Sequence, residues 1–236
     1  MALNDIINKK GAALDKLLTA FDSEFNSYSM QARTAIAKFF RQGVFADGII
    51  KSVMADFDEI AEGWAVRHQA VLRFSKDMAG ELGISFAPTK RAIRDYALLR
   101  DNNVSKLTGI NDFYVADIQK FGLQSEIGGA SLKEITTGLE ELFSTMGRRL
   151  NTEAFTGMWI SDAVIKKDMF EEAGIDKYYY FGPNDNKTRD DCLATMQDPR
   201  QSTGWTMAEI NASRTPFITR GGYNCRHEWV PFVEGI

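Results

Sequence analysis

Hydrophobic positions in the first 83 residues recur at helical spacing. Six of them lie three or four residues apart on one helical face: Leu14, Leu17, Leu18, Phe21, Phe25 and Tyr28. The pattern continues from Ile36 to Trp64, and Gly43 and Gly48 are the expected breaks between helices. Because burial of such a face supplies most helical stability, mutual packing in a helical bundle is favoured over a docking surface for a partner helix.

Helical signals continue beyond a break at Gly83 and Pro88. Proline is tolerated in the first turn of a helix, so the segment APTKRAIRDYALLRD is expected to resume as one. The glycine-containing segment FGLQSEIGGA, residues 121–130, is the expected hinge or domain boundary.

A capping box follows this hinge. Ser131 stands three residues before Glu134, a spacing at which each side chain satisfies the other's free backbone N–H. A helix is therefore expected to start there, with an apolar face running to Leu150. A further helix is expected from about Thr152 to Ala173, stopped by Gly174.

The pattern changes beyond residue 175. YYYFGP is typical of a short aromatic strand, NDNKTRDD of a polar turn, and FITRGGYNCRHEWVPF of a strand pair around Gly221 and Gly222. The predicted fold class is α+β, with a mainly α-helical N-terminal half and a small C-terminal α+β module. The expected divisions are a helical bundle region at 1–129, connecting helices at 130–175 and the module at 176–236.

Charge and hydropathy exclude some classes of function for this chain. The 236 residues carry 28 basic and 32 acidic side chains, for a net charge of −4, and no segment is strongly basic. Since phosphate neutralisation supplies most of the affinity for nucleic acid, autonomous DNA binding is not expected. The chain shows no apolar run of membrane-spanning length, and charges interrupt its first apolar stretch, so neither a secretory signal nor a membrane anchor is expected.

Two cysteines and two histidines limit the metal chemistry. Cys192, Cys225 and His227 form the one constellation with metal-ligand character, and a fourth zinc ligand would have to come from Asp190, Asp191 or water. Two buried, inert thiols beside a hydrogen-bonded histidine are the favoured alternative. A disulfide between strands is a third, and it would require an oxidising compartment.

Catalytic motifs are scarce. The sequence contains no phosphate-binding loop, nucleophile elbow or dinucleotide fingerprint, and no third group orients a Cys/His nucleophilic pair. We therefore expect no enzymatic activity, with a small nuclease or hydrolase using His227, Arg226 and Glu228 as the alternative. Arg189 and Arg226 each lie near an acidic residue and a cysteine, where a guanidinium can tie loops together through bidentate bonds.

The order of C-terminal motifs resembles the Mu F-like minor head proteins, or head morphogenesis proteins, of tailed bacteriophages. The similarity covers about residues 131–232 and begins with Asn151-Thr152-Glu153, Glu172-Ala173-Gly174-Ile175 and Tyr178-Tyr179-Tyr180. Its linked motif residues are Asp185, Thr188, Arg189 and Cys192 in one turn, and Gly221, Gly222, Tyr223, Cys225, Arg226 and His227 near the end. Two departures from the family are Asp191, which stands next to Cys192, and the lack of a further cysteine or histidine that many relatives carry in the first turn.

The resemblance implies a structural virion protein. Its expected partners are the phage portal protein, the major capsid protein or both, with packaged DNA nearby, further copies of itself and no membrane. It would be made in the host bacterial cytoplasm and lie in the capsid interior or at the portal vertex, acting in head assembly or in genome packaging and delivery. We expect either no cofactor or a structural zinc ion.

Two other roles follow from the same resemblance. One is a nuclease or hydrolase effector packaged in the virion; because the chain stops four residues after Phe232, its activity would have to reside in the module itself. The other is an internal protein that leaves the particle during genome ejection.

Overall fold

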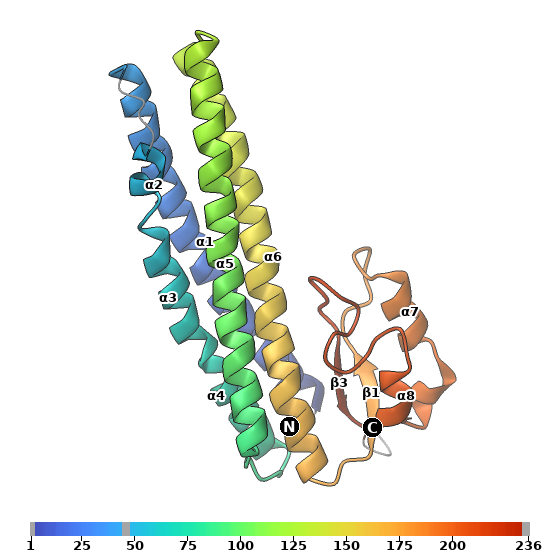
Figure 1. Ribbon diagram of the computed structural model, residues 1–236. Helices are drawn as coiled ribbons and strands as arrows, with labels where there is room; N and C mark the ends of the chain where they lie inside the picture. The colour runs from blue at the N-terminus through green and yellow to red at the C-terminus, as the bar shows by residue number, and fades with distance from the viewer. Residues whose placement is uncertain (1–2, 44–47, 233–236) are drawn as a thin grey trace. The chain divides into compact units, whose positions relative to one another are not determined.

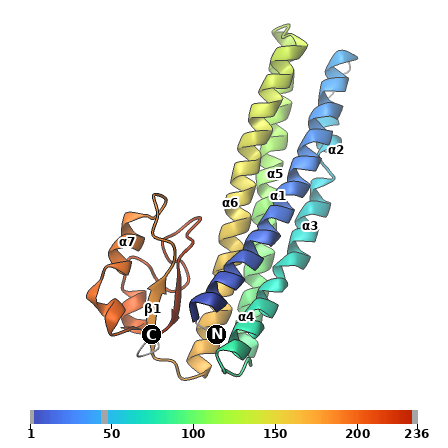
Figure 2. The same ribbon diagram turned by 180° about the vertical axis from the view of Figure 1, so that it is seen from behind.

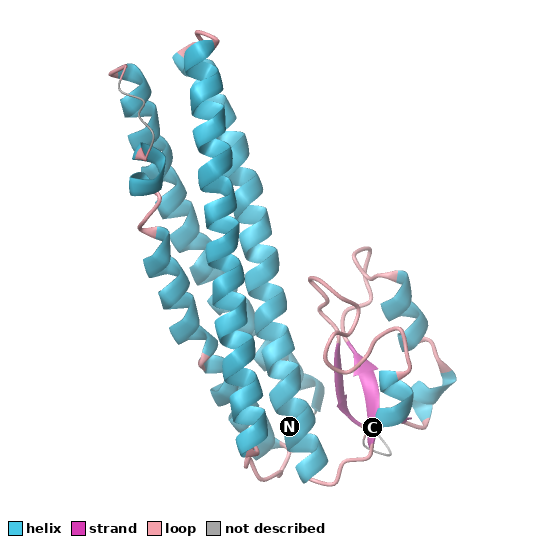
Figure 3. Cartoon of the chain, in the orientation of Figure 1, coloured by secondary structure: helices cyan, strands magenta, loops and turns pink. Residues whose placement is uncertain are grey.

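The computed structural model describes residues 3–43 and 48–232 (Figure 1). The helical part contains α1 (Leu3–Arg41), α2 (Ile49–Val53), α3 (Phe57–His68), α4 (Ala70–Glu81), α5 (Lys90–Ile127) and α6 (Leu132–Glu172). The C-terminal part contains β1 (Lys177–Phe181), α7 (Asp190–Met196), the 3-10 helix η1 (Pro199–Ser202), β2 (Trp205–Thr206), α8 (Met207–Asn211) and β3 (Glu228–Pro231). The fold is α+β, mainly helical with a small C-terminal α+β module, as the sequence predicts (Figure 3).

The long helix α6 differs from the expected pair of helices. It runs without a break through 41 residues, because its buried apolar stripe continues across the predicted junction from Leu150 to Ala154 and Met158. Thr152 does not cap a new helix; its hydroxyl donates to the Arg148 carbonyl at 2.9 Å within the same helix. The predicted division near residue 150 is therefore wrong.

The start of α6 confirms the predicted capping box. The backbone N–H of Ser131 donates to Glu134 Oε2 at 2.7 Å, and the N–H of Glu134 donates to Ser131 Oγ at 3.3 Å. At the other end, Gly174 adopts a left-handed φ of 71°, which terminates the helix as the sequence predicts.

Two compact units share the long helices. One unit contains the described residues up to Gly11, those from Gln69 to Arg100 and those from Phe155 on; the other contains Ala12–His68 and Asp101–Ala154. The expected divisions at 129/130 and 175/176 follow chain order. The observed units do not, because α1, α5 and α6 each contribute one stretch to each unit.

Aromatic side chains form much of the core of the unit built from 12–68 and 101–154. Here α1 lies beside α3, and α5 beside α6 (Figures 1 and 2). The Phe21 and Trp64 rings lie 5.0 Å apart, and Tyr28 packs between Phe57 and Phe143 at 5.8 and 6.5 Å. Burial of the α1 stripe within the unit fits the expected helical bundle.

A three-stranded antiparallel sheet organises the C-terminal module, with strand order β2-β1-β3. Tyr178 pairs with Trp205 on one side and Pro231 on the other, and Tyr180 pairs with Trp229. Of the strand pair predicted around Gly221 and Gly222, the second strand is confirmed as β3, whereas the strand predicted before the glycines does not form. Residues 217–224 form turns and bends, because left-handed φ values at Arg220 (48°), Gly222 (86°) and Asn224 (54°) break the extended backbone.

Four charged side chains form a buried ring in the unit that contains the sheet. Lys10, Asp162, Lys166 and Glu228 alternate in sign around it, and each side chain is at most 3% exposed. Lys10 Nζ contacts Asp162 and lies 3.2 Å from Glu228 Oε2, while Lys166 Nζ contacts Glu228 and lies 3.0 Å from Asp162 Oδ2. Burial alone would raise the pKa of Glu228, but Lys10 and Lys166 together hold that pKa below its ordinary value.

Within the described parts of the chain, no helix combines the length and the apolarity that a membrane crossing requires.

Candidate metal centre

Three side chains predicted as metal ligands lie together in the C-terminal module. Cys192 is in the first turn of α7, whereas Cys225 and His227 immediately precede β3. The two sulfurs lie 3.8 Å apart, Cys225 Sγ lies 3.8 Å from His227 Nδ1, and all three donor atoms fall within 4.8 Å of one another. All three residues are buried and both cysteines are free, so a disulfide does not join the two thiols.

His227 is oriented for Nδ1 to act as the donor atom. Its Nε2 lies 2.9 Å from the Pro183 carbonyl oxygen, which can only accept a hydrogen bond. The hydrogen is therefore assigned to Nε2, and the lone pair on Nδ1 faces Cys225. A Cβ at Gly182 would lie 2.3 Å from the imidazole, so this close packing requires glycine.

The two thiols differ in acidity because they share a hydrogen bond. That bond, from Cys192, lowers the pKa of Cys225 to about 3 against the raising effect of burial, and the Tyr180 hydroxyl, 3.5 Å away, lowers it further. The same bond and burial raise the pKa of Cys192. Cys225 Sγ also accepts a hydrogen bond from the Gly221 N–H at 3.3 Å, so the arrangement favours one thiolate beside one thiol.

Two arginines tie the loops around this cluster. The guanidinium of Arg189 donates to the carbonyl oxygens of Gly221 and Tyr223. Arg226 donates to both carboxylate oxygens of Asp185, at 2.7 and 2.8 Å, and this pairing lowers the pKa of Asp185. The first polar turn is thereby connected to the segment that carries Cys225.

Thr188 and Gly222 complete the structural motif. The Thr188 hydroxyl donates to the Pro183 carbonyl at 2.9 Å and accepts from the Asp185 N–H at 2.9 Å. Gly222 has a φ of 86°, and a Cβ there would lie 3.3 Å from the Arg189 guanidinium. The motif residues therefore share one network of contacts around the thiols.

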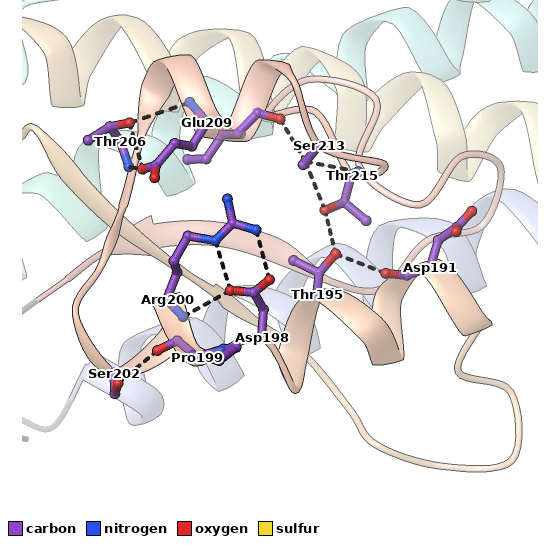
Figure 4. A network of polar contacts seen from close by, with 11 residues as sticks. Asp191, Thr195, Asp198, Pro199, Arg200, Ser202, Thr206, Glu209, Ser213 and Thr215 are labelled. Atoms are coloured by element: carbon purple, nitrogen blue, oxygen red, sulfur yellow. Dashed lines mark hydrogen bonds and ion pairs between the residues drawn. The ribbon is translucent and has the colours of Figure 1, made fainter.

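A second polar network holds α7, which carries Cys192 (Figure 4). The Thr195 hydroxyl donates to the Asp191 carbonyl and lies 2.9 Å from the Thr215 hydroxyl. The Thr215 carbonyl in turn accepts from Trp229 Nε1 at 2.7 Å, which connects α7 to β3. Figure 4 also shows the capping box at the start of α8, in which Thr206 and Glu209 bond each other's backbone N–H.

The two aspartates considered from the sequence as a possible fourth ligand are not part of this cluster. Asp190 is exposed, and the carboxylate of Asp191 lies 3.3 Å from Arg214. Sequence reasoning missed Tyr180 as a neighbour of the two thiols; its hydroxyl oxygen lies 3.5 Å from both sulfurs. Burial raises the pKa of Tyr180. The one sequence signal that could have indicated Tyr180 is the alternation along β1, which places Tyr178 and Tyr180 on the same buried face.

The three consecutive residues considered for hydrolysis have separate partners. His227 contacts Pro183 and Cys225, Arg226 pairs with Asp185, and Glu228 belongs to the buried ring of charges. Acid–base catalysis needs two groups within hydrogen-bond reach of one substrate. The side chains of Arg226, His227 and Glu228 are not arranged around a shared point.

Comparison of the chain with protein-family models, curated proteins and solved structures found no match.

Proposed function

We propose that the protein is a structural minor head protein of a tailed phage, associated with the portal or the inner capsid surface. The linked set of C-terminal motifs carries this proposal, because its order resembles that of the Mu F-like family. In the folded chain, two segments more than 30 residues apart are joined by Arg189 with Gly221 and by Arg226 with Asp185. Because these bonds connect the two segments that carry the motifs, they support the interpretation that both segments belong to one module.

The remainder of the chain suits an assembly role. Helices α1, α5 and α6 are 39, 38 and 41 residues long, and the net charge of −4 does not favour autonomous binding to DNA. Assembly proteins act through complementary surfaces rather than through a catalytic centre. The role would lie in head assembly or in genome packaging and delivery, within the capsid interior or at the portal vertex.

Phage particles produced without the protein test this role. We expect them to be incomplete or non-infectious, and we expect the wild-type chain supplied in trans to restore them. An Arg189→Ala chain, which removes the tie to Gly221 and Tyr223, should restore them less well. Complete, infectious particles in the absence of the protein would contradict the proposal.

We further propose that Cys192, Cys225 and His227 hold a structural zinc ion. Thiolate sulfur and imidazole nitrogen are preferred zinc donors, and tetrahedral ligation with Zn–S of about 2.3 Å places two sulfurs about 3.8 Å apart. The observed separation of the sulfurs is 3.8 Å. His227 Nε2 contacts a backbone carbonyl. In zinc-binding histidines, the nitrogen that does not bind the metal usually makes such a hydrogen bond, which orients the ring.

Metal analysis of the purified chain tests the zinc site. We expect one zinc ion per chain, and we expect Cys225→Ala to release it and unfold the C-terminal module. Metal-free protein that loses only about 1 kcal/mol of stability on Cys225→Ala would instead identify two inert buried thiols. A Ser202→Ala chain, altered at an exposed position of η1, serves as the control and should keep its zinc.

A further inference from the structure

Tyr180 lies where a fourth ligand of the proposed zinc site would stand. Its hydroxyl oxygen is 3.5 Å from Cys192 Sγ and 3.5 Å from Cys225 Sγ, and the sulfurs are 3.8 Å apart. In a tetrahedral site with Zn–S of about 2.3 Å and Zn–O of about 2.0 Å, the sulfur–oxygen edge is about 3.5 Å and the sulfur–sulfur edge about 3.8 Å. The observed triangle has the dimensions of one face of such a tetrahedron.

Other sources of a fourth ligand are less well placed. Three carboxylates close to these residues in the sequence are engaged elsewhere: Asp185 pairs with Arg226, Asp191 with Arg214, and Glu228 with Lys166. Among the described residues, the group of cysteine, histidine and carboxylate donors contains Cys192, Cys225 and His227 alone. Each of these three is at most 5% exposed, which disfavours an open, water-bound position.

Contacts on several sides hold Tyr180 in this position. Its backbone N–H donates to Gln201 Oε1 and its carbonyl accepts from Gln201 Nε2, both at 2.9 Å. Its ring stacks on the His227 imidazole, with 5.3 Å between centroids and 13° between planes, and packs against Trp229 at 4.8 Å. The phenol oxygen is thus fixed beside the thiols by strand pairing and ring packing, as a preorganised ligand requires.

We propose that Tyr180 is the fourth zinc ligand, so that Tyr180, Cys192, Cys225 and His227 form a closed site with two sulfur donors, one nitrogen and one oxygen. This inference rests on the proposed zinc site. On metal binding, a bond forms between the phenol oxygen and zinc while the phenol O–H bond breaks, and the proton passes to solvent. The step involves no change of oxidation state.

Titration of zinc into the metal-free, full-length chain tests the assignment. We expect a tyrosinate band in the ultraviolet difference spectrum of the wild-type chain, which Tyr180→Phe abolishes. We also expect Tyr180→Phe to release one proton fewer per zinc and to bind zinc at least about 100-fold more weakly, beyond the 10–100-fold typical of an outer-shell partner. Tyr178→Phe is the matched control, because Tyr178 is buried on the same strand and its hydroxyl donates to the Ile175 carbonyl.

The outcomes separate the two proposals. Binding of one zinc ion without a tyrosinate band, and with equal proton release in the wild-type and Tyr180→Phe chains, would overturn the role of Tyr180 and leave the zinc site standing. Failure of the wild-type chain to bind zinc would overturn both. The spectrum of the wild-type chain alone decides the assignment if Tyr180→Phe does not fold.

Discussion

At the scale of single residues, Gly221 shows how closely the two thiols are enclosed. A Cβ at this position would lie 2.3 Å from Cys192 Sγ and 3.1 Å from Cys225 Sγ, and the N–H of Gly221 bonds Cys225. Glycine is therefore needed here for space: any side chain would displace the sulfurs.

Gly221→Ala should lower the free energy of unfolding by about 1–3 kcal/mol, the usual cost of overpacking a core. The same substitution should weaken zinc binding. Gly109→Ala is the control: its site in α5 has nothing within 4 Å of the new Cβ, and it should stabilise the helix by about 0.5–1 kcal/mol. Denaturant unfolding measures both changes, and equal effects from the two substitutions would refute the packing account.

The candidate site could be predicted in part from these residues. Cys192, Cys225 and His227 are recognisable from their donor chemistry, and the structure brings them together. Tyr180 could not be recognised, because phenols are uncommon zinc ligands and no spacing rule relates a strand tyrosine to a distant turn. Asp191 was a reasonable candidate beside Cys192, but Arg214 attracts its carboxylate.

At the scale of elements, the start of α6 depends on a charge-assisted cap. The hydrogen bond from Ser131 to Glu134 lowers the pKa of this exposed carboxyl. The pKa of a glutamate carboxyl is about 4.3 in an unfolded chain. A carboxyl whose pKa is lower in the folded chain stabilises the fold at pH values above this unfolded-state pKa. That contribution is lost as the pH falls through the folded-state pKa.

Ser131→Ala should therefore raise the pKa of Glu134 toward its ordinary value. The substitution should also destabilise the chain at pH 7, and the difference from wild type should shrink below about pH 4, where Glu134 is protonated. NMR titration of the Glu134 carboxyl and unfolding at both pH values measure these effects. An unchanged pKa in Ser131→Ala would contradict the assigned cause.

Neighbouring lysines on α6 provide a matched test of the buried ring. Lys166→Met leaves Asp162 and Glu228 buried with Lys10 as their only partner in the ring and should cost about 3–5 kcal/mol. Lys167 pairs with the half-exposed Glu171, so Lys167→Met should change stability by less than about 1 kcal/mol. Thermal unfolding of the two variants gives the comparison, and similar losses would show that the ring contributes no more than a surface pair.

Sequence motifs predicted where helices begin and end better than whether a helix continues without a break. Capping at Ser131 and the stop at Gly174 depend on neighbouring residues, and both are confirmed. The predicted break before Thr152 failed because the buried stripe continues through it. Of the strand pair predicted around Gly221, the first strand does not form, because the chain there is held in turns by contacts with the distant Arg189.

At the scale of the whole molecule, the compact units do not follow chain order. Lys10, near one end of the chain, and Glu228, near the other, belong to the same ring of charges. Helical periodicity identifies which stretches are helical, but not which stretch packs into which unit. The α+β class was therefore predictable from the sequence, whereas the division into units depends on long-range packing.

The proposed role as a minor head protein is tested most directly by a quantitative pull-down of the tagged chain from phage-infected cells. Mass spectrometry would identify the recovered proteins, with Cys225→Ala, expected to disrupt the C-terminal module, as the comparison. We expect the portal protein, the major capsid protein or both to be enriched with the wild-type chain, and less so with the variant. Recovery of the folded wild-type chain alone, or with host RNA or a host enzyme, would contradict it.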